Sequence, residues 1–370
     1  MSYCWAEIDL NAILFNLKKI REIVGDNVKI MAIVKADAYG HGLEEVAKQI
    51  SSKENVYFGV SSLQEGIRLR EEGIDEPVVN LLPPLPQDIR EMVHWGITPI
   101  ITNDGIAKLI DDECKRQGKI LPVHIKIDTG MGRLGIRPES AVDFVLKIRE
   151  YGNLFLEGIY THFASADTDK EFTEYQLKVF LTTLKKLEEK GIKFPLRHSA
   201  NSSAILNFSS SHLDMVRPGI ALYGVNPSPY NSVKLKPAMS VKAKVIQVKE
   251  LPAGHSISYG RTHILSRNTR VAVIGIGYAQ GLLRALSNKG SVLINGKRAP
   301  ILGIICMDQC VIDVTDSGEV RVGDEAVIMG KQDAEEITAW ELANLSGTIP
   351  YELLTAFGHQ LPRRYKFSEQ

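Results

Sequence analysis

From residue 29 to residue 218 the chain alternates between short apolar segments and stretches with helical spacing. The segments that we predict as strands are 29–35, 56–60, 77–82, 98–102, 121–128, 155–162, 195–199 and 214–218. Eight parallel strands alternating with helices over about 200 residues are typical of a (β/α)8 barrel, the TIM-type member of the α/β class. A doubly wound sheet is the alternative, but no G-x-G-x-x-G motif follows the first of these strands.

The chain after the predicted barrel has a different texture. Residues 223–233 contain Pro227, Pro229 and several Asn and Ser residues, which predicts a linker. We then expect a mostly β C-terminal domain, with strands at 241–251, 256–259, 270–278, 291–294 and 300–314 and one amphipathic helix at 340–345. The expected divisions are an N-terminal strand in 1–10 that pairs with this domain, a barrel in 11–233, and the β-rich domain in 234–370.

Composition excludes several classes of function. The formal net charge is zero, which offers no electrostatic footprint for nucleic acid or for an anionic membrane. No apolar run has the length of a membrane span, and the N-terminus lacks the pattern of a signal peptide. Four cysteines do not suggest a disulfide framework, so we expect a cytoplasmic protein. Cys306 and Cys310 lie four apart without ligand partners nearby, so we expect buried thiols and no metal.

Functional side chains are expected where the barrel strands end, because barrel active sites lie at the carboxyl ends of the strands. The apolar run 30–34 ends on Lys35. Burial lowers the pKa of such an ammonium and prepares it for Schiff-base or general-base chemistry, although a lysine that snorkels to the sheet rim is an equal alternative. Other candidates at strand ends are Arg133, His162, Ser202, Arg217, Gly219 and Ile220. Loops after strands seven and eight are the usual phosphate site of such barrels.

The segment from Val34 to Gly42, Val-Lys-Ala-Asp-Ala-Tyr-Gly-His-Gly, resembles the pyridoxal-phosphate lysine motif of alanine racemases. Further similarity lies in Ser256-Ile-Ser-Tyr-Gly-Arg261 and Ile305-Cys-Met-Asp-Gln309, so the resemblance covers both predicted domains. It implies pyridoxal 5'-phosphate as cofactor and a homodimer with shared active sites. The implied activity interconverts L-alanine and D-alanine by a two-base mechanism, which supplies D-alanine for peptidoglycan.

The resemblance also implies residue roles. Lys35 and Tyr259 would be the two acid/base groups, with Tyr259 contributed by the partner subunit. The residues that would hold the cofactor phosphate are Tyr39, Ser202, Gly219, Ile220 and Tyr351. Arg217 would face the pyridine nitrogen, with His162 hydrogen-bonded behind it. An arginine there donates without giving up its proton, which discourages transamination.

Further implied roles concern the substrate. Arg133 would reach the phenolic oxygen of the cofactor and, together with the backbone N–H of Met307, the substrate carboxylate. Lys126 matches a lysine that is often carbamylated in the family. Tyr278 and Arg284 would line the entrance. The chain departs from the family pattern at two positions, Ile304 in place of an arginine and Gln280 in place of an aspartate, which affects entrance charge and side-chain selectivity.

Three other functions compete with this interpretation. A broader racemase acting on serine or a basic amino acid is the nearest alternative. A pyridoxal-phosphate-dependent decarboxylase of basic amino acids shares the two-domain plan but does not explain Ser258-Tyr-Gly260. A non-catalytic carrier of pyridoxal phosphate resembles the barrel alone, and the residues after the linker argue against it.

Overall fold

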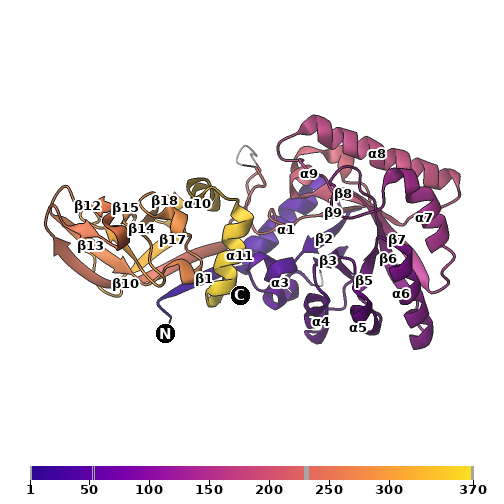
Figure 1. Ribbon diagram of the computed structural model, residues 1–370, viewed down its shortest axis with the longest axis horizontal. Coiled ribbons are helices and arrows are strands. Elements are labelled where there is room, and N and C mark those ends of the chain that lie inside the picture. Colours follow the sequence, from indigo (N-terminus) through magenta and orange to yellow (C-terminus); the bar gives the residue numbers. More distant parts are fainter. Residues whose placement is uncertain (1, 52, 54, 229–232, 368–370) are drawn as a thin grey trace.

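The computed structural model describes residues 2–51, 53, 55–228 and 233–367. The molecule is elongated, with a barrel at one end and a β-rich part at the other (Figure 1). Part of the predicted linker, residues 229–232, lies outside the described residues. Among the described residues, no helix combines the length and the apolar character that a membrane crossing needs.

Eight parallel strands close into a barrel in chain order, which confirms the predicted fold. They are β2 (Lys29–Ile33), β3 (Val56–Val60), β4 (Val78–Asn80), β5 (Thr98–Ile101), β6 (Leu121–Lys126), β7 (Leu154–Tyr160), β8 (Leu196–Asn201) and β9 (Met215–Arg217). Pairing of Lys29 with Met215 and of Ile30 with Val216 closes the ring. The strands are largely buried because helices cover their outer faces, which is why the sequence shows continuous apolar runs.

Helices surround the barrel between the strands (Figure 1). They are α1 (Leu10–Val24), α3 (Leu43–Ile50), α4 (Leu63–Glu71), α5 (Ile89–Trp95), α6 (Asp104–Gln117), α7 (Ala141–Ile148), α8 (Lys170–Glu189) and α9 (Ser202–Asn207). Asp9 caps α1 by accepting from the backbone N–H groups of Asn11 and Ala12, and Gly25 ends it with φ of 81°. This first helix therefore begins and ends at residues that the sequence marks.

The second part is built on a nine-stranded sheet in the order β18-β17-β14-β15-β16-β13-β10-β1-β19. Its strands are β1 (Cys4–Asp9), β10 (Met239–Leu251), β13 (Thr269–Ile274), β14 (Ser291–Ile294), β15 (Lys297–Leu302), β16 (Cys310–Asp313), β17 (Glu325–Gln332), β18 (Glu335–Ile337) and β19 (Arg363–Lys366). A small pair, β11 (Ser256–Ile257) and β12 (His263–Ile264), extends from it. Because β1 pairs with both β10 and β19, segments from the two ends of the chain lie in one sheet.

The C-terminal region differs from the sequence prediction in several places. The sequence predicts none of the strands β12, β17, β18 and β19, and of the predicted strand 256–259 only Ser256–Ile257 is extended. Two helices follow the sheet strands, α10 (Ala339–Ser346) and α11 (Pro350–Gln360), where the sequence predicts one. Pro350 occupies the first turn of α11, a position that tolerates proline because the backbone N–H that proline lacks would have no acceptor within the helix there. The predicted strand 300–314 is two strands, because Gly303 turns the chain with φ of 73°.

Candidate active site

Lys35 lies two residues after strand β2 and is the first residue of a turn of unusual backbone, labelled α2 (Lys35–Tyr39). Ala36, Asp37, Ala38 and Tyr39 all have φ between 53° and 55°, which is the left-handed region. Such a conformation costs roughly 1–2 kcal/mol per residue with a β-carbon. Strain of this kind persists only where surrounding contacts hold it, and it marks functional sites.

The carboxylate of Asp37 holds this turn in place. It accepts from the backbone N–H of Leu43 at 2.9 Å and pairs with Arg68 at 3.3 Å. It also pairs with Arg363, whose guanidinium donates to the carbonyls of Gly40 and Gly358 as well. Neither Asp37 nor Arg363 is a residue that sequence reasoning singled out, although Asp37 lies inside the lysine motif.

Four cations gather at the carboxyl end of the barrel: Lys35, Lys126, Arg133 and Arg217. Burial and the nearby Arg133 lower the pKa of Lys35 below its ordinary value. Burial, Arg133 and Arg217 lower the pKa of Lys126, which is 4 % exposed, to about 8. Within the described ranges, no ion pair joins any of the four to a carboxylate. The barrel mouth is therefore electropositive in a chain of zero net charge, which suits an anionic ligand.

Arg217 is 4 % exposed and its guanidinium is held on two sides. Nη1 donates to His198 Nδ1 at 2.8 Å, and Nη2 donates to the carbonyls of Thr161 at 2.7 Å and Ser199 at 3.0 Å. His162 Nδ1 lies 3.4 Å from Nη2, and burial together with Arg217 holds the pKa of His162 well below its usual range. In the part of the chain that the structure describes, no acceptor lies within hydrogen-bond distance of Arg217 Nε.

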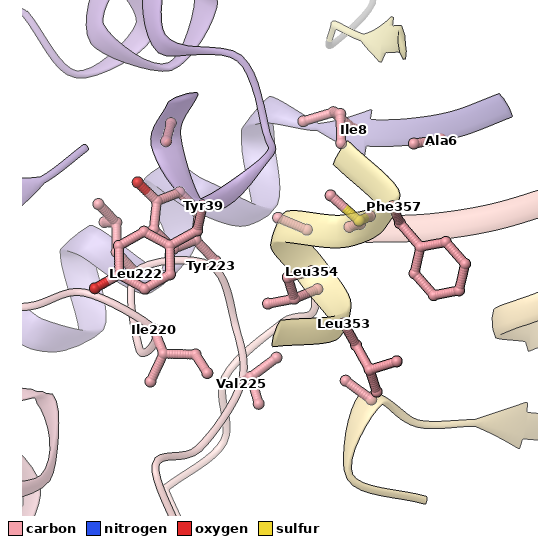
Figure 2. Close-up of a cluster of buried hydrophobic side chains, with 14 of the residues drawn as sticks. Ala6, Ile8, Tyr39, Ile220, Leu222, Tyr223, Val225, Leu353, Leu354 and Phe357 are labelled. Carbon is pink, nitrogen blue, oxygen red and sulfur yellow. The ribbon is translucent and has the colours of Figure 1, made fainter. Parts of the chain in front are cut away.

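A compact polar cradle forms beside these cations after strands β8 and β9. Ser202 Oγ accepts from the backbone N–H groups of Gly219 at 2.9 Å and Ala221 at 3.3 Å. The Tyr39 hydroxyl approaches the same glycine so closely that a β-carbon there would lie 2.5 Å from it. Figure 2 shows Tyr39 and Ile220 in one cluster of side chains.

Helix α11 brings a second tyrosine to the cradle. The ring centroid of Tyr351 lies 5.9 Å from that of Tyr39. The helix can approach because Gly358 faces Gly40, where a β-carbon would lie 2.1 Å from a backbone oxygen. The structure thus brings together all five residues that the sequence assigned to the cofactor phosphate.

The remaining candidates lie together on the β-rich part. Tyr259 is 72 % exposed, Met307 55 % and Tyr278 43 %, and Arg284 is exposed as well. The backbone N–H of Tyr278 donates to the Cys306 carbonyl at 3.1 Å, which places these segments side by side.

The loops that carry these candidates are fixed by hydrogen bonds. Ser258 Oγ donates to the carbonyl of Ile304 at 2.5 Å. Gln280 accepts from the Gly277 N–H at 3.0 Å and donates to Asp308 at 2.9 Å. The glutamine that departs from the family pattern therefore organises the loop beside Met307.

The structure separates Tyr259 from Lys35 within one chain. Tyr259 lies between β11 and β12, and β12 is at the opposite end of the molecule from the barrel (Figure 1). Among the described residues, no contact joins Tyr259 to the cations of the barrel mouth. Within one chain, Tyr259 and Lys35 therefore do not lie in the same site.

The residues present fit pyridoxal 5'-phosphate. The amine of Lys35 suits its aldehyde, Arg133 suits its phenolate oxygen, and the unpaired Nε–H of Arg217 suits its ring nitrogen. Because Gly219 has no β-carbon, a ligand can approach its backbone closely. Across the described ranges, no group of three or more metal-ligating His, Cys, Asp or Glu side chains is found.

Comparison with known proteins agrees with this arrangement. The model of the alanine racemase N-terminal domain matches residues 8–227, and that of the alanine racemase C-terminal domain matches residues 238–365. An alanine racemase of Halothermothrix orenii is 43 % identical over 365 residues, which cover 98 % of this chain and 96 % of that protein.

Two solved structures are similar along the whole chain. An alanine racemase of Clostridium difficile 630 has a TM-score of 0.93 at 35 % identity and covers 99 % of this chain and 96 % of its own. One from Bartonella henselae, with covalently bound pyridoxal phosphate, has a TM-score of 0.89 at 28 % identity and covers 99 % and 100 %. Family models, sequence relatives and solved structures point the same way, and this chain belongs to the alanine racemase family.

Proposed function

We propose that this protein is an alanine racemase that interconverts L-alanine and D-alanine. The observation that carries the proposal is the barrel mouth, where Lys35, with its lowered pKa, stands among cations without a paired carboxylate. A lowered pKa makes the amine easier to deprotonate, and a deprotonated amine can bond covalently to a carbonyl cofactor or accept a proton.

Pyridoxal 5'-phosphate would be bound by residues of the barrel mouth and would supply the electron sink for breaking the Cα–H bond of the substrate. Lys35 would carry it covalently. The residues that would hold its phosphate are Tyr39, Ser202, Gly219, Ile220 and Tyr351.

Arg217 would donate its free Nε–H to the ring nitrogen. Burial lowers the pKa of Arg217 to about 10, which still leaves the guanidinium protonated at neutral pH. Because this group donates without releasing its proton, Arg217 would keep the ring nitrogen unprotonated and would discourage transamination.

Racemisation needs one proton to leave one face of Cα and another to arrive on the opposite face. Lys35 would serve one face and Tyr259 the other, each as base for one enantiomer and acid for its mirror image. Tyr259 is exposed and lies next to β12, which is at the opposite end of the molecule from the barrel (Figure 1), so we propose that it enters the site of a partner subunit in a homodimer.

The substrate carboxylate would be bound by Arg133 and by the backbone N–H of Met307. Among the described residues, that N–H has no protein acceptor. Tyr278 and Arg284 would line the entrance. Ile304, in place of an arginine, is the feature that keeps serine and basic amino acids as competing substrates. From the family alone, we also propose a cytoplasmic enzyme whose D-alanine enters peptidoglycan.

The test is an assay of purified, cofactor-loaded protein with L-alanine, L-serine and L-lysine. We expect the D-enantiomer from alanine, with kcat/KM at least about tenfold higher than for the other two, a 1.4 kcal/mol difference in transition-state stabilisation. Preference for serine or lysine would identify a broader racemase, and release of CO2 a decarboxylase. Borohydride reduction followed by peptide mapping should place the cofactor on Lys35; a label on Lys126 would overturn the site.

A further inference from the structure

A line of polar side chains runs through the barrel interior beneath Arg217. His198 Nδ1 accepts from Arg217 Nη1 at 2.8 Å, and His198 Nε2 lies 3.1 Å from His124 Nδ1. His124 Nε2 in turn lies 3.0 Å from the carboxylate of Glu157. Both imidazoles are fully buried, and Glu157 is the partly exposed end of the line.

The barrel is shaped to hold these rings. A β-carbon at Gly158 would lie 2.6 Å from the His124 ring, so a glycine is required opposite it. Tyr160 stacks on His198 with centroids 4.7 Å apart and planes within 9°. Tyr57 donates to the other oxygen of Glu157 at 3.3 Å. Rings that are fixed in this way have defined hydrogen-bond partners on both nitrogens.

The groups at the two ends of this line, a guanidinium and a carboxylate, determine which nitrogen of each imidazole carries the proton. A guanidinium has only donors, so His198 must present a lone pair at Nδ1 and, as a neutral ring, carry its proton on Nε2. His124 must then accept at Nδ1 and carry its proton on Nε2, where an ionised carboxylate, which has only acceptors, receives it. Burial together with Arg217 holds the pKa of His198 well below its usual range, which agrees with a neutral ring.

We infer that Glu157 is a positioning residue which, through His124, fixes the tautomer of His198 and so the orientation in which Arg217 offers its Nε–H to the site. Without this acceptor, His124 can carry its proton on Nδ1 and donate to His198. His198 would then turn a proton toward the guanidinium, which places two donors face to face. This inference rests on the proposed function only where Arg217 meets the cofactor ring.

The main variants compare Glu157→Leu with Glu157→Gln and Tyr57→Phe. The leucine removes the acceptor. The glutamine keeps an oxygen that can accept from His124 while it loses the charge, and Tyr57→Phe leaves the carboxylate and both imidazoles intact. Protein labelled with 15N-histidine reports the tautomers by NMR without cofactor. We expect His124 and His198 protonated at Nε2 in the wild type, Tyr57→Phe and Glu157→Gln, and a mixed or reversed pattern in Glu157→Leu.

The second readout is the ratio of racemisation to transamination in the loaded enzyme. We expect Glu157→Leu to lower kcat by about 10–100-fold, as loss of a partner behind a ligand typically does, and to raise the fraction of transamination with little change in KM. Glu157→Gln should restore most of the wild-type ratio. Wild-type tautomers and an unchanged ratio in Glu157→Leu would overturn the inference.

A second pair of variants covers the case in which Glu157→Leu does not fold. His124→Gln can accept from His198 and donate to Glu157, so it preserves the direction of the line, whereas His124→Leu breaks it. We expect the transamination fraction to rise in His124→Leu only, and equal ratios in both would overturn the inference. If the wild type racemises no amino acid, the proposed function fails, while the NMR measurement still decides the proton order.

Discussion

The hydroxyl of Tyr39 lies so close to Gly219 that a β-carbon on the glycine would stand 2.5 Å from the oxygen. The same glycine donates its N–H to Ser202. Tyr39 and Ser202, two residues of the proposed phosphate cradle, therefore both contact Gly219, which has no side chain.

Gly219→Ala should weaken cofactor binding, because the new methyl group displaces the Tyr39 ring from the cradle. We expect the Kd for pyridoxal phosphate, measured by fluorescence titration, to rise about 10-fold or more, which corresponds to 1.4 kcal/mol or more. Gly152→Ala, where nothing lies within 4 Å of the added atom, is the matched control. Adding Tyr39→Phe to Gly219→Ala should recover part of the lost affinity, and no recovery would argue against the contact as the cause.

Lys126 should make stability depend on alkaline pH. Its pKa is about 8 in the folded chain and about 10.4 in an unfolded one, so the unfolded state binds more protons between these values. Stability therefore rises as pH increases from about 8 to 10. In CO2-free buffer, the unfolding free energy of Lys126→Met should exceed that of the wild type most below pH 8, by on the order of 3 kcal/mol, and the gap should close toward pH 10. The control Lys18→Met, at an exposed position, should show no such closing gap.

The same lysine should accept carbon dioxide. A buried amine that is largely neutral above pH 8 is a nucleophile, and the resulting carbamate would place a negative charge beside Arg133. Protein equilibrated with 13C-bicarbonate should show a carbamate resonance that is absent from Lys126→Met. A resonance that persists in the variant would assign the modification to another amine.

Asp37→Asn should loosen the left-handed turn after Lys35. Burial alone would raise the pKa of Asp37, but the hydrogen bond from Leu43 and the charge of Arg363 hold it below its usual value. Its stabilisation is therefore present above the unfolded pKa near 3.9 and is lost as pH falls through the folded value. We expect a loss on the order of 2 kcal/mol at neutral pH, with the difference from the wild type shrinking in acid. Asp26→Asn, at an exposed position, is the control. If the unfolding free energies of all three proteins changed in the same way as pH falls, the stabilising role of the Asp37 contacts would be contradicted.

Two inactive variants should complement each other if the site is shared. Lys35→Ala and Tyr259→Phe should each lose activity, by about 10²–10⁴-fold for the tyrosine. After complete subunit exchange of equal amounts, half the dimers are mixed and each has one intact site, so about a quarter of wild-type activity should return. A mass measurement of the mixture must show that mixed dimers have formed. Exchange without recovery would mean that both groups serve the site of one chain.

The barrel could be predicted from sequence because its strands are buried on both faces and each ends at a change of composition. Lys35 and Arg217 were found in the same way, by their position at strand ends. Helix α11 was missed because Gly347 and Pro350 suggest a break, whereas the proline occupies the first helical turn.

Other features depend on contacts that local sequence does not record. Two alanines with positive φ contradict their own preference, and one of the contacts that hold the turn comes from Arg363, 326 residues after Asp37. Glu157 and His124 lie in the middle of strands, where a polar residue gives no sign of its partner. The distance between Tyr259 and the barrel of its own chain likewise follows from tertiary structure alone.

The ion pair between Asp37 and Arg363 also affects the order in which parts of the protein can fold during synthesis. Arg363 belongs to β19 and follows Asp37 by 326 residues, so it is synthesised long after Lys35. A ribosome must therefore add β19 before Arg363 can reach the turn. Until then the nascent barrel has Lys35 but lacks one of the contacts that hold the turn, so we expect full retention of pyridoxal phosphate only after β19 has been made.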